Sequence, residues 1–344
     1  MTPTKTLRAK SPTDLLACVP TLLGFHPEHS VVMVTAGRAG APVHARVDLP
    51  ADARGRREIL EIADELADVA ARSRVSEVAV VVYTADLALA TTVAAAMTEV
   101  LRDADVACLL VISTDGRCWR VHERDGSLRP GDQGTPYELA NHPLTVAAVI
   151  EGRVVHASRE ALRASLAPVD EHSLDSVRRS ADDRVGRMSS PGRRLPGSPD
   201  AVAARDHLVR EGRWVRERVR RFLADRGMLR GEDIARLLVA IRSIDVRDVA
   251  WAEIRRESSH THVDLWRDVV RRSPSELVAA PAALLAFAAW LAGDGALAWC
   301  AVDRCQEADP GYTLAALVTQ ALASATPPSV WSPFDPAELS LFAR

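Results

Sequence analysis

Two continuous apolar runs, separated by one amphipathic stretch, constrain the fold of this chain more than any other feature. Neither Val78–Tyr83 nor Cys108–Ile112 contains a charged residue, as is typical of strands that are covered on both faces of a sheet. Between them lies an apolar stripe at helical spacing: Leu89, Val93, Met97, Val100 and Leu101. Asp86 stands where it can cap that helix. The pattern predicts a strand–helix–strand unit with a right-handed crossover.

The residues before this unit predict a capped helix and a β-hairpin. Ser11 stands in the position of an N-cap, and we expect Pro20 and Gly24 to end the helix. Ser30–Ala36 is rich in β-branched residues and predicts the first strand of the hairpin. The second strand is Val43–Leu49, in which polar residues alternate with apolar ones: His44, Arg46 and Asp48. Such alternation indicates a strand with one polar face.

Further elements complete an α/β domain. Arg56–Ser73 has the apolar periodicity of a helix. Asp115-Gly116 has the residues of a type I′ turn, which needs positive φ at both central positions and would return Cys118–His122 as an antiparallel edge strand. Helices are expected at Thr145–Ile150 and Arg159–Leu166. The predicted fold class is α/β, a mixed sheet with helices on both faces.

The second half of the chain predicts an all-helical domain. Between Arg178 and Pro199 the apolar periodicity disappears and Gly, Pro, Ser and Arg dominate, as in a linker. Beyond it every apolar pattern is helical. In the most regular part, Gly293-Asp294-Gly295 joins two alanine-rich helices and resembles a tetratricopeptide unit. An ordinary helical hairpin is the alternative, because an array needs at least about three units.

These patterns divide the chain into four segments. We expect a mixed α/β domain over residues 1–175 and a basic linker rich in Pro, Gly and Ser over residues 176–200. An all-helical domain follows over residues 201–330, and a C-terminal tail over residues 331–344. A chain of 344 residues is long enough for two domains, each with its own core.

Composition bears on cellular setting more than on activity. The net charge of −3 shows no general attraction to nucleic acid. Only Lys5 and Lys10 are lysines, so arginine supplies nearly all 43 basic residues, as codon usage in a GC-rich genome would. The five scattered cysteines form no CxxC pair, which favours free thiols in a reducing compartment. With no signal peptide or membrane span recognisable, a cytoplasmic location is expected.

Several longer motifs resemble one protein family. Near the N-terminus they are Leu22-Leu23-Gly24-Phe25-His26-Pro27 and Ala45-Arg46-Val47-Asp48-Leu49-Pro50. Downstream they are Ala289-Trp290-Leu291-Ala292-Gly293-Asp294-Gly295 and Asp309-Pro310-Gly311-Tyr312. Together they are similar to the actinobacterial family called domain of unknown function 4192, over nearly the whole chain. The resemblance implies an actinobacterial, cytoplasmic protein and no particular activity.

The best geometric place for a ligand is the carboxyl end of the predicted sheet, where open α/β sheets bind small molecules. The candidate residues stand in the helix-to-strand loop and at the ends of two strands: Gly24, Phe25, His26, Asp48, Tyr83 and Asp86. Asp86 is equally well explained as a helix cap, and the loop residues as a structural turn. Gly293, Asp294 and Gly295 are a structural turn or, alternatively, a site.

A basic cluster opens the helical half. Seven arginines lie close together: Arg205, Arg210, Arg213, Arg216, Arg218, Arg220 and Arg221. They adjoin the basic linker. An alternative function is therefore a nucleic-acid-associated factor that contacts phosphates through residues 178–221. Interleaved acids and few aromatic residues favour a solvated helix face instead.

The sequence therefore favours a non-enzymatic interaction or regulatory protein with a protein partner at the helical domain. A small ligand at the α/β domain is a further expectation. A hydrolase or transferase that uses acidic residues at the carboxyl end of the sheet is the alternative. No catalytic motif, metal-ligand set or cofactor motif is recognisable, so we expect no metal and no cofactor.

Overall fold

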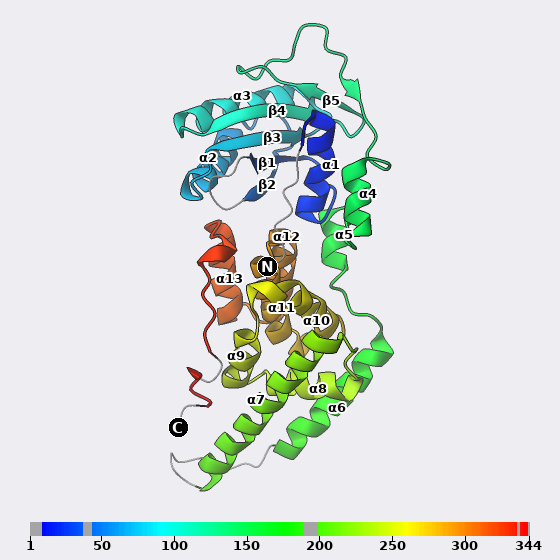
Figure 1. The fold of residues 1–344 in the computed structure, drawn as a ribbon, viewed down its shortest axis with the longest axis vertical. Helices are drawn as coiled ribbons and strands as arrows, with labels where there is room; N and C mark the ends of the chain where they lie inside the picture. Colours follow the sequence, from blue (N-terminus) through cyan, green and yellow to red (C-terminus); the bar gives the residue numbers. More distant parts are fainter. Residues whose placement is uncertain (1–8, 37–42, 189–198, 336–337, 343–344) are drawn as a thin grey trace. The chain divides into compact units, whose positions relative to one another are not determined.

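The computed structural model describes residues 9–36, 43–188, 199–335 and 338–342, and the chain divides into two compact units (Figure 1). The first comprises residues 1–162 and 324–327, and the second comprises residues 163–323 and 328–344. The division falls within a short helix, Arg159–Ala164, ahead of the boundary expected at residue 175.

The first unit is a mixed α/β layer structure. Its elements in chain order are α1 (Pro12–Leu23), β1 (Ser30–Ala36), β2 (His44–Asp48), α2 (Arg56–Arg72), β3 (Glu77–Tyr83), α3 (Leu87–Asp103), β4 (Ala107–Thr114), β5 (Cys118–Val121), β6 (Thr135–Pro136), α4 (Pro143–Ile150) and α5 (Arg159–Ala164). The strands form one sheet in the order β2-β1-β3-β4-β5-β6. Only β3 and β4 pair in parallel, as the strand–helix–strand pattern predicted, and all other pairs are antiparallel.

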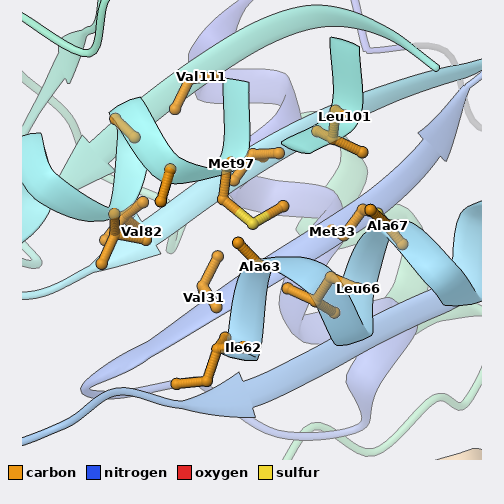
Figure 2. Close-up of a cluster of buried hydrophobic side chains, with 14 of the residues drawn as sticks. Val31, Met33, Ile62, Ala63, Leu66, Ala67, Val82, Met97, Leu101 and Val111 are labelled. Atoms are coloured by element: carbon orange, nitrogen blue, oxygen red, sulfur yellow. The ribbon is translucent and has the colours of Figure 1, made fainter. Parts of the chain in front are cut away.

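One face of this sheet is covered by α2 and α3, and the core lies between them (Figure 2). Alternate residues of the central strands point into it, among them Val31, Val82 and Val111. Leu66 of α2 and Met97 of α3 meet these strands and are almost fully buried. Alternate strand residues form one side of this core and the apolar stripes of the helices form the other. The helical stripe of α3 predicted from the sequence is therefore confirmed.

Three local expectations in this unit are wrong. Pro20 does not end helix α1, which runs on to Leu23 with Gly24 as its C-cap, as expected; the Gly24 N–H donates to the Pro20 carbonyl at 2.8 Å. Asp115 does not have the positive φ of a type I′ turn; its carboxylate instead accepts from the N–H groups of Arg117 and Cys118, both at 2.8 Å. That side-chain turn replaces the backbone turn. Finally, β5 is not the edge, because β6 pairs outside it.

The second unit is helical. Its elements are α6 (Glu171–Met188), α7 (Pro199–Asp225), α8 (Gly231–Ala240), α9 (Ile244–Ala252), α10 (Ser259–Arg271), α11 (Ala279–Ala292), α12 (Gly295–Ala308) and α13 (Thr313–Ala323), with 3-10 turns at Arg256–Ser258, Ser275–Leu277 and Pro328–Val330. Helix α11 is buried along nearly its whole length and packs against α10, α12 and α13. It is the central helix of this unit, which explains why its sequence is apolar on all sides.

The expected linker is partly a helix. Helix α6 occupies residues 171–188 and packs against α8, and its Val177 and Ala181 are almost fully buried. These two residues are four positions apart on one helix face. Two apolar residues among arginines and serines are too few to predict a helix from the sequence. Residues 189–198, the remainder of the expected linker apart from Pro199 and Asp200, lie outside the described residues. Helix α9 was not predicted from the sequence; its buried Val246 and Val249 line one face.

The segment expected to be a C-terminal tail is packed where it is described. Trp331 stacks on Trp251 of α9 with 5.4 Å between ring centroids, and it meets Phe287 of α11 edge-on at 4.9 Å. Phe334 also packs against Trp251, at 5.2 Å. Large aromatic residues are therefore what anchors this segment, since each buries a large apolar area.

The α11–α12 hairpin has the turn that the sequence predicted. Gly293 ends α11 in the left-handed region, with φ 83°, and the Asp294 carboxylate caps α12 by accepting from the Leu297 N–H at 3.0 Å. We expect Gly293→Val to lower the free energy of unfolding by about 1–3 kcal/mol, because a β-branched side chain is strained at that φ. Gly295→Ala is the matched control and should change it by less than about 0.5 kcal/mol, since a Cβ there meets only Leu322, at 3.9 Å.

Chemical denaturation of the two variants checks this prediction. Equal losses would show that the turn tolerates a side chain at Gly293 and that the assigned strain is wrong.

Candidate functional site

The second face of the sheet carries a row of polar and aromatic side chains at one end. Because Val31, Val82 and Val111 point to the α2–α3 core, their strand neighbours point to the opposite face. The strand register then brings residues at or next to the ends of five strands into one line: Asp48, Ser30, Tyr83, Thr114 and Trp119. Helix α1 lies at this face, where Thr13 accepts a hydrogen bond from the Trp119 indole N–H at 3.2 Å.

Three polar atoms in this part of the sheet are buried without a hydrogen-bond partner among the described residues. They are the Ser30 hydroxyl, the Tyr83 hydroxyl and Nε of Arg46. Ser30 is directly opposite Tyr83 on the neighbouring strand, and side chains in such pairs start about 4.5–5.5 Å apart. Arg46 pairs with Val32, the next residue of β1 on the same face, and so lies diagonally from Ser30. We call Ser30, Arg46 and Tyr83 the polar triad.

One nitrogen of the Arg46 guanidinium is well bound. Its Nη2 lies 2.6 Å from the Asp48 carboxylate and donates to the Glu28 carbonyl at 3.2 Å. The ring of Phe25 lies beneath the guanidinium, 5.7 Å from its central carbon. These contacts fix the guanidinium in place, and a guanidinium can bond through all its N–H groups at once. Its Nε is therefore a positioned donor.

Tyr83 remains a neutral donor under ordinary conditions. Burial raises the pKa of its hydroxyl, and the neighbouring Tyr137 raises it further. Tyr137 itself shares a hydrogen bond of 3.0 Å with the Thr114 hydroxyl, which also accepts from the Gly116 N–H at 3.0 Å. The Thr114–Tyr137 pair thus satisfies its own hydroxyls and leaves that of Tyr83 unpartnered.

The structure brings together three of the six residues predicted for a ligand site. Phe25 and Asp48 both contact Arg46, and Tyr83 lies two strands away from Asp48 in the same row. Gly24 instead ends α1 with φ 75°, and the exposed His26 joins the loop to residue 156 through its backbone N–H.

Asp86 acts as a helix cap. Its carboxylate accepts from the N–H groups of Ala88 and Leu89 at 2.9 and 3.1 Å, so it holds the start of α3. Gly293, Asp294 and Gly295 lie in the other unit, as the hairpin turn described above.

Four of the seven arginines expected to form a basic patch pair with carboxylates in the helical unit. Arg216 and Arg220 both bind Glu253, Arg221 binds Glu217, and Arg218 lies 3.5 Å from Asp233. The Arg205 guanidinium donates to the Ser340 carbonyl at 3.4 Å. Arg210 and Arg213 form no ion pair with a carboxylate of the residues that the structure describes. Paired arginines have less charge to offer to phosphates.

The described residues hold neither a metal-binding cluster nor a membrane-spanning helix. Within them, no three His, Cys, Asp or Glu side chains gather closely enough to hold a metal ion. No helix in the described part of the chain combines the length and apolar character needed to cross a membrane.

A family model for a domain of unknown function, DUF4192, matches residues 12–329. The chain belongs to the DUF4192 family. No curated protein and no solved structure matches it. The DUF4192 match includes the polar triad and extends through both units almost to the end of the chain, so the family combines the α/β sheet with the helical unit.

Two members of the triad in this DUF4192 chain, Ser30 and Arg46, were not among the residues predicted from the sequence. Arg46 was visible as one of three alternating polar residues in β2, and the same period of two places it beside Asp48. Ser30 begins β1 and looks like an ordinary strand boundary in the sequence. Only the strand order, which sets β1 between β2 and β3, reveals that it stands opposite Tyr83.

Proposed function

We propose that the α/β unit of this protein binds a small polar ligand through the polar triad. The observation that carries the proposal is the direct opposition of two buried hydroxyls, Ser30 and Tyr83, that have no partner among the described residues. A buried polar group left without a hydrogen bond costs about 1–3 kcal/mol, and a charged one more. Three such groups on adjacent strands therefore favour a ligand that bonds them together.

The triad favours binding rather than catalysis. The hydroxyl of Tyr83 stays protonated, since burial raises its pKa, and Ser30 has no histidine or carboxylate assigned as a base. Asp48, the nearest acid in the row, pairs with Arg46. The available groups are two hydroxyls and one guanidinium N–H, which together suit a ligand with acceptor oxygens.

Native mass spectrometry of the protein purified gently from its natural host tests this proposal. Wild type should carry a small molecule that is released on denaturation, and the Ser30→Ala/Tyr83→Phe variant should carry none. Two matched controls should retain it: Ser73→Ala removes another buried, unpartnered hydroxyl of the same unit, and Tyr312→Phe removes a tyrosine hydroxyl of the other unit.

Two outcomes would contradict the proposal. One is wild type without any bound molecule, and the other is equal retention by the double variant. The stability of the ligand-free Tyr83→Phe variant gives a further check. It should equal or exceed that of ligand-free wild type, because the variant lacks a buried hydroxyl that has no hydrogen-bond partner among the described residues.

We further propose that the helical unit presents a surface to a protein partner and that the protein acts in the cytoplasm. The buried α11 supports the first point by giving the outer helices a fixed base, and Leu317 of α13 and Val330 expose more than half of their surface. All five cysteines are free thiols, which supports a reducing compartment. Capture of a protein by the intact chain but not by a Leu317→Glu variant would test the surface.

A further inference from the structure

A serine and a histidine on the other face of the sheet form a hydrogen-bonded pair. Ser113 is the second-last residue of β4, and its hydroxyl lies 2.8 Å from Nε2 of His122, which directly follows β5. Both are buried on the side of the sheet that α3 covers, whereas the polar triad lies on the opposite side. The two sites therefore share a sheet and no residue.

The neighbouring backbone fixes the tautomer of His122. Its Nδ1 lies 2.7 Å from the carbonyl of Gly126, and a carbonyl can only accept. Nδ1 must therefore carry the proton, and Nε2 presents its lone pair to the Ser113 hydroxyl, which donates. Burial lowers the pKa of His122 and keeps the imidazole neutral. This is the arrangement in which a histidine can take a proton from a serine nucleophile.

The position in the sheet also suits chemistry. Ser113 is at the carboxyl end of β4, beside the carboxyl end of the parallel strand β3, and α3 begins a few residues after β3. Reactive groups in α/β sheets commonly stand at such an end, next to the start of the following helix. Gly126 is held closely against α3, because a Cβ there would lie 2.5 Å from the backbone nitrogen of Ala95. The orienting carbonyl is thus fixed by packing.

We propose that Ser113 is the nucleophile of an acyl-transfer site, with His122 as its general base. The Ser113 oxygen forms a bond to the carbonyl carbon of an ester or activated acyl group while its proton passes to Nε2 of His122. The bond to the leaving group then breaks, and the leaving group takes that proton. Water attacks the acyl-serine in the second half, gives its proton to Nε2, and Ser113 is restored as the carboxylic acid departs.

Access to Ser113 requires movement of the loop from Glu123 to Leu128. Ser113 is 1% exposed, and this loop folds over His122 through the Gly126 carbonyl. An ion pair of 2.7 Å between Glu123 and Arg129 closes the base of the loop. Both partners are well exposed to solvent, so this ion pair adds little to the closed state, and the packing of Gly126 against α3 is the larger contact that opening must break.

Labelling with an alkyl fluorophosphonate tests the site without a known substrate. The serine oxygen displaces fluoride from phosphorus, and its proton passes to His122, so a stable adduct marks the nucleophile. In the full-length protein we expect slow labelling that peptide mass spectrometry places on Ser113. His122→Gln should slow it at least about 100-fold, the usual contribution of a general base. Glu123→Gln, which weakens the ion pair at the base of the loop, should speed it several-fold.

Ser73→Ala is the matched control, because Ser73 is a buried serine of the same unit that has no assigned hydrogen-bond partner, and its loss should leave labelling unchanged. The proposal is overturned if Ser113 stays unlabelled in both wild type and Glu123→Gln. It is equally overturned if folded His122→Gln, checked by circular dichroism, labels at the rate of wild type.

Discussion

Replacing Arg216 and Arg220 together by methionine should lower the free energy of unfolding of the helical unit by about 3–5 kcal/mol. Both arginines bind the carboxylate of Glu253, each through Nε at 2.8 Å. The Glu253 side chain is only 7% exposed, whereas those of the arginines are 30% and 55% exposed. Removing both cations therefore leaves a buried carboxylate without a counter-ion, which is far more costly than leaving a cation near solvent.

The difference in burial between Glu253 and its two arginines provides a control. Adding Glu253→Gln to the double variant should recover part of the lost stability, because the buried charge is then gone. Arg221→Met removes an exposed pair with Glu217 and should change stability by less than about 0.5 kcal/mol. Urea denaturation of the four proteins checks these values. If Glu253→Gln makes the double variant still less stable, the buried carboxylate is not the source of the effect.

Acidification from pH 8 to pH 5 should destabilise both units through buried neutral histidines. Burial lowers the pKa of His44 in the first unit and of His262 in the second to about 4. The unfolded histidine has its ordinary pKa near 6.5 and takes up a proton first as the pH falls. The stabilisation is therefore complete above about pH 6.5 and is lost towards pH 4. The expected loss at pH 5 is on the order of 2 kcal/mol for each histidine.

His262→Gln separates this effect from general acid denaturation. The His262 ring donates from Nε2 to the Glu253 carbonyl at 3.0 Å, and glutamine can keep a donor there without a titrating group. The stability of the helical unit in this variant should change less between pH 8 and pH 5 than that of wild type. His260→Gln, an exposed histidine of the same helix, is the control and should keep the full dependence. An unchanged slope in His262→Gln would refute this assignment.

The sequence predicted those parts of the fold that rest on local periodicity. The apolar runs of β3 and β4, the stripe of α3 and the turn at Gly293 are where the pattern placed them. What failed were features decided by few side chains, such as the turn at Asp115 and the helix α6 with Val177 and Ala181 as its buried face. There a carboxylate or two apolar residues outweigh the composition around them.

The candidate sites could be predicted only in part, because both depend on pairing between strands. Tyr83 and Asp48 were identifiable as strand ends, but their relation to Ser30 follows from the order β2-β1-β3. Ser113 and His122 are nine residues apart in a hairpin that the sequence did predict, yet nothing in the sequence shows that the Gly126 carbonyl orients the imidazole. Long-range register, rather than residue type, makes these groups neighbours.

High-resolution diffraction from crystals of the protein purified from its natural host tests the central claim most directly. The claim is that one ligand accepts hydrogen bonds from the Ser30 hydroxyl, the Tyr83 hydroxyl and Nε of Arg46. We predict electron density for a single molecule of several atoms that accepts hydrogen bonds from all three. Separate water molecules at these atoms, or a site closed by protein groups alone, would contradict the account, since the three donors would then be satisfied without any ligand.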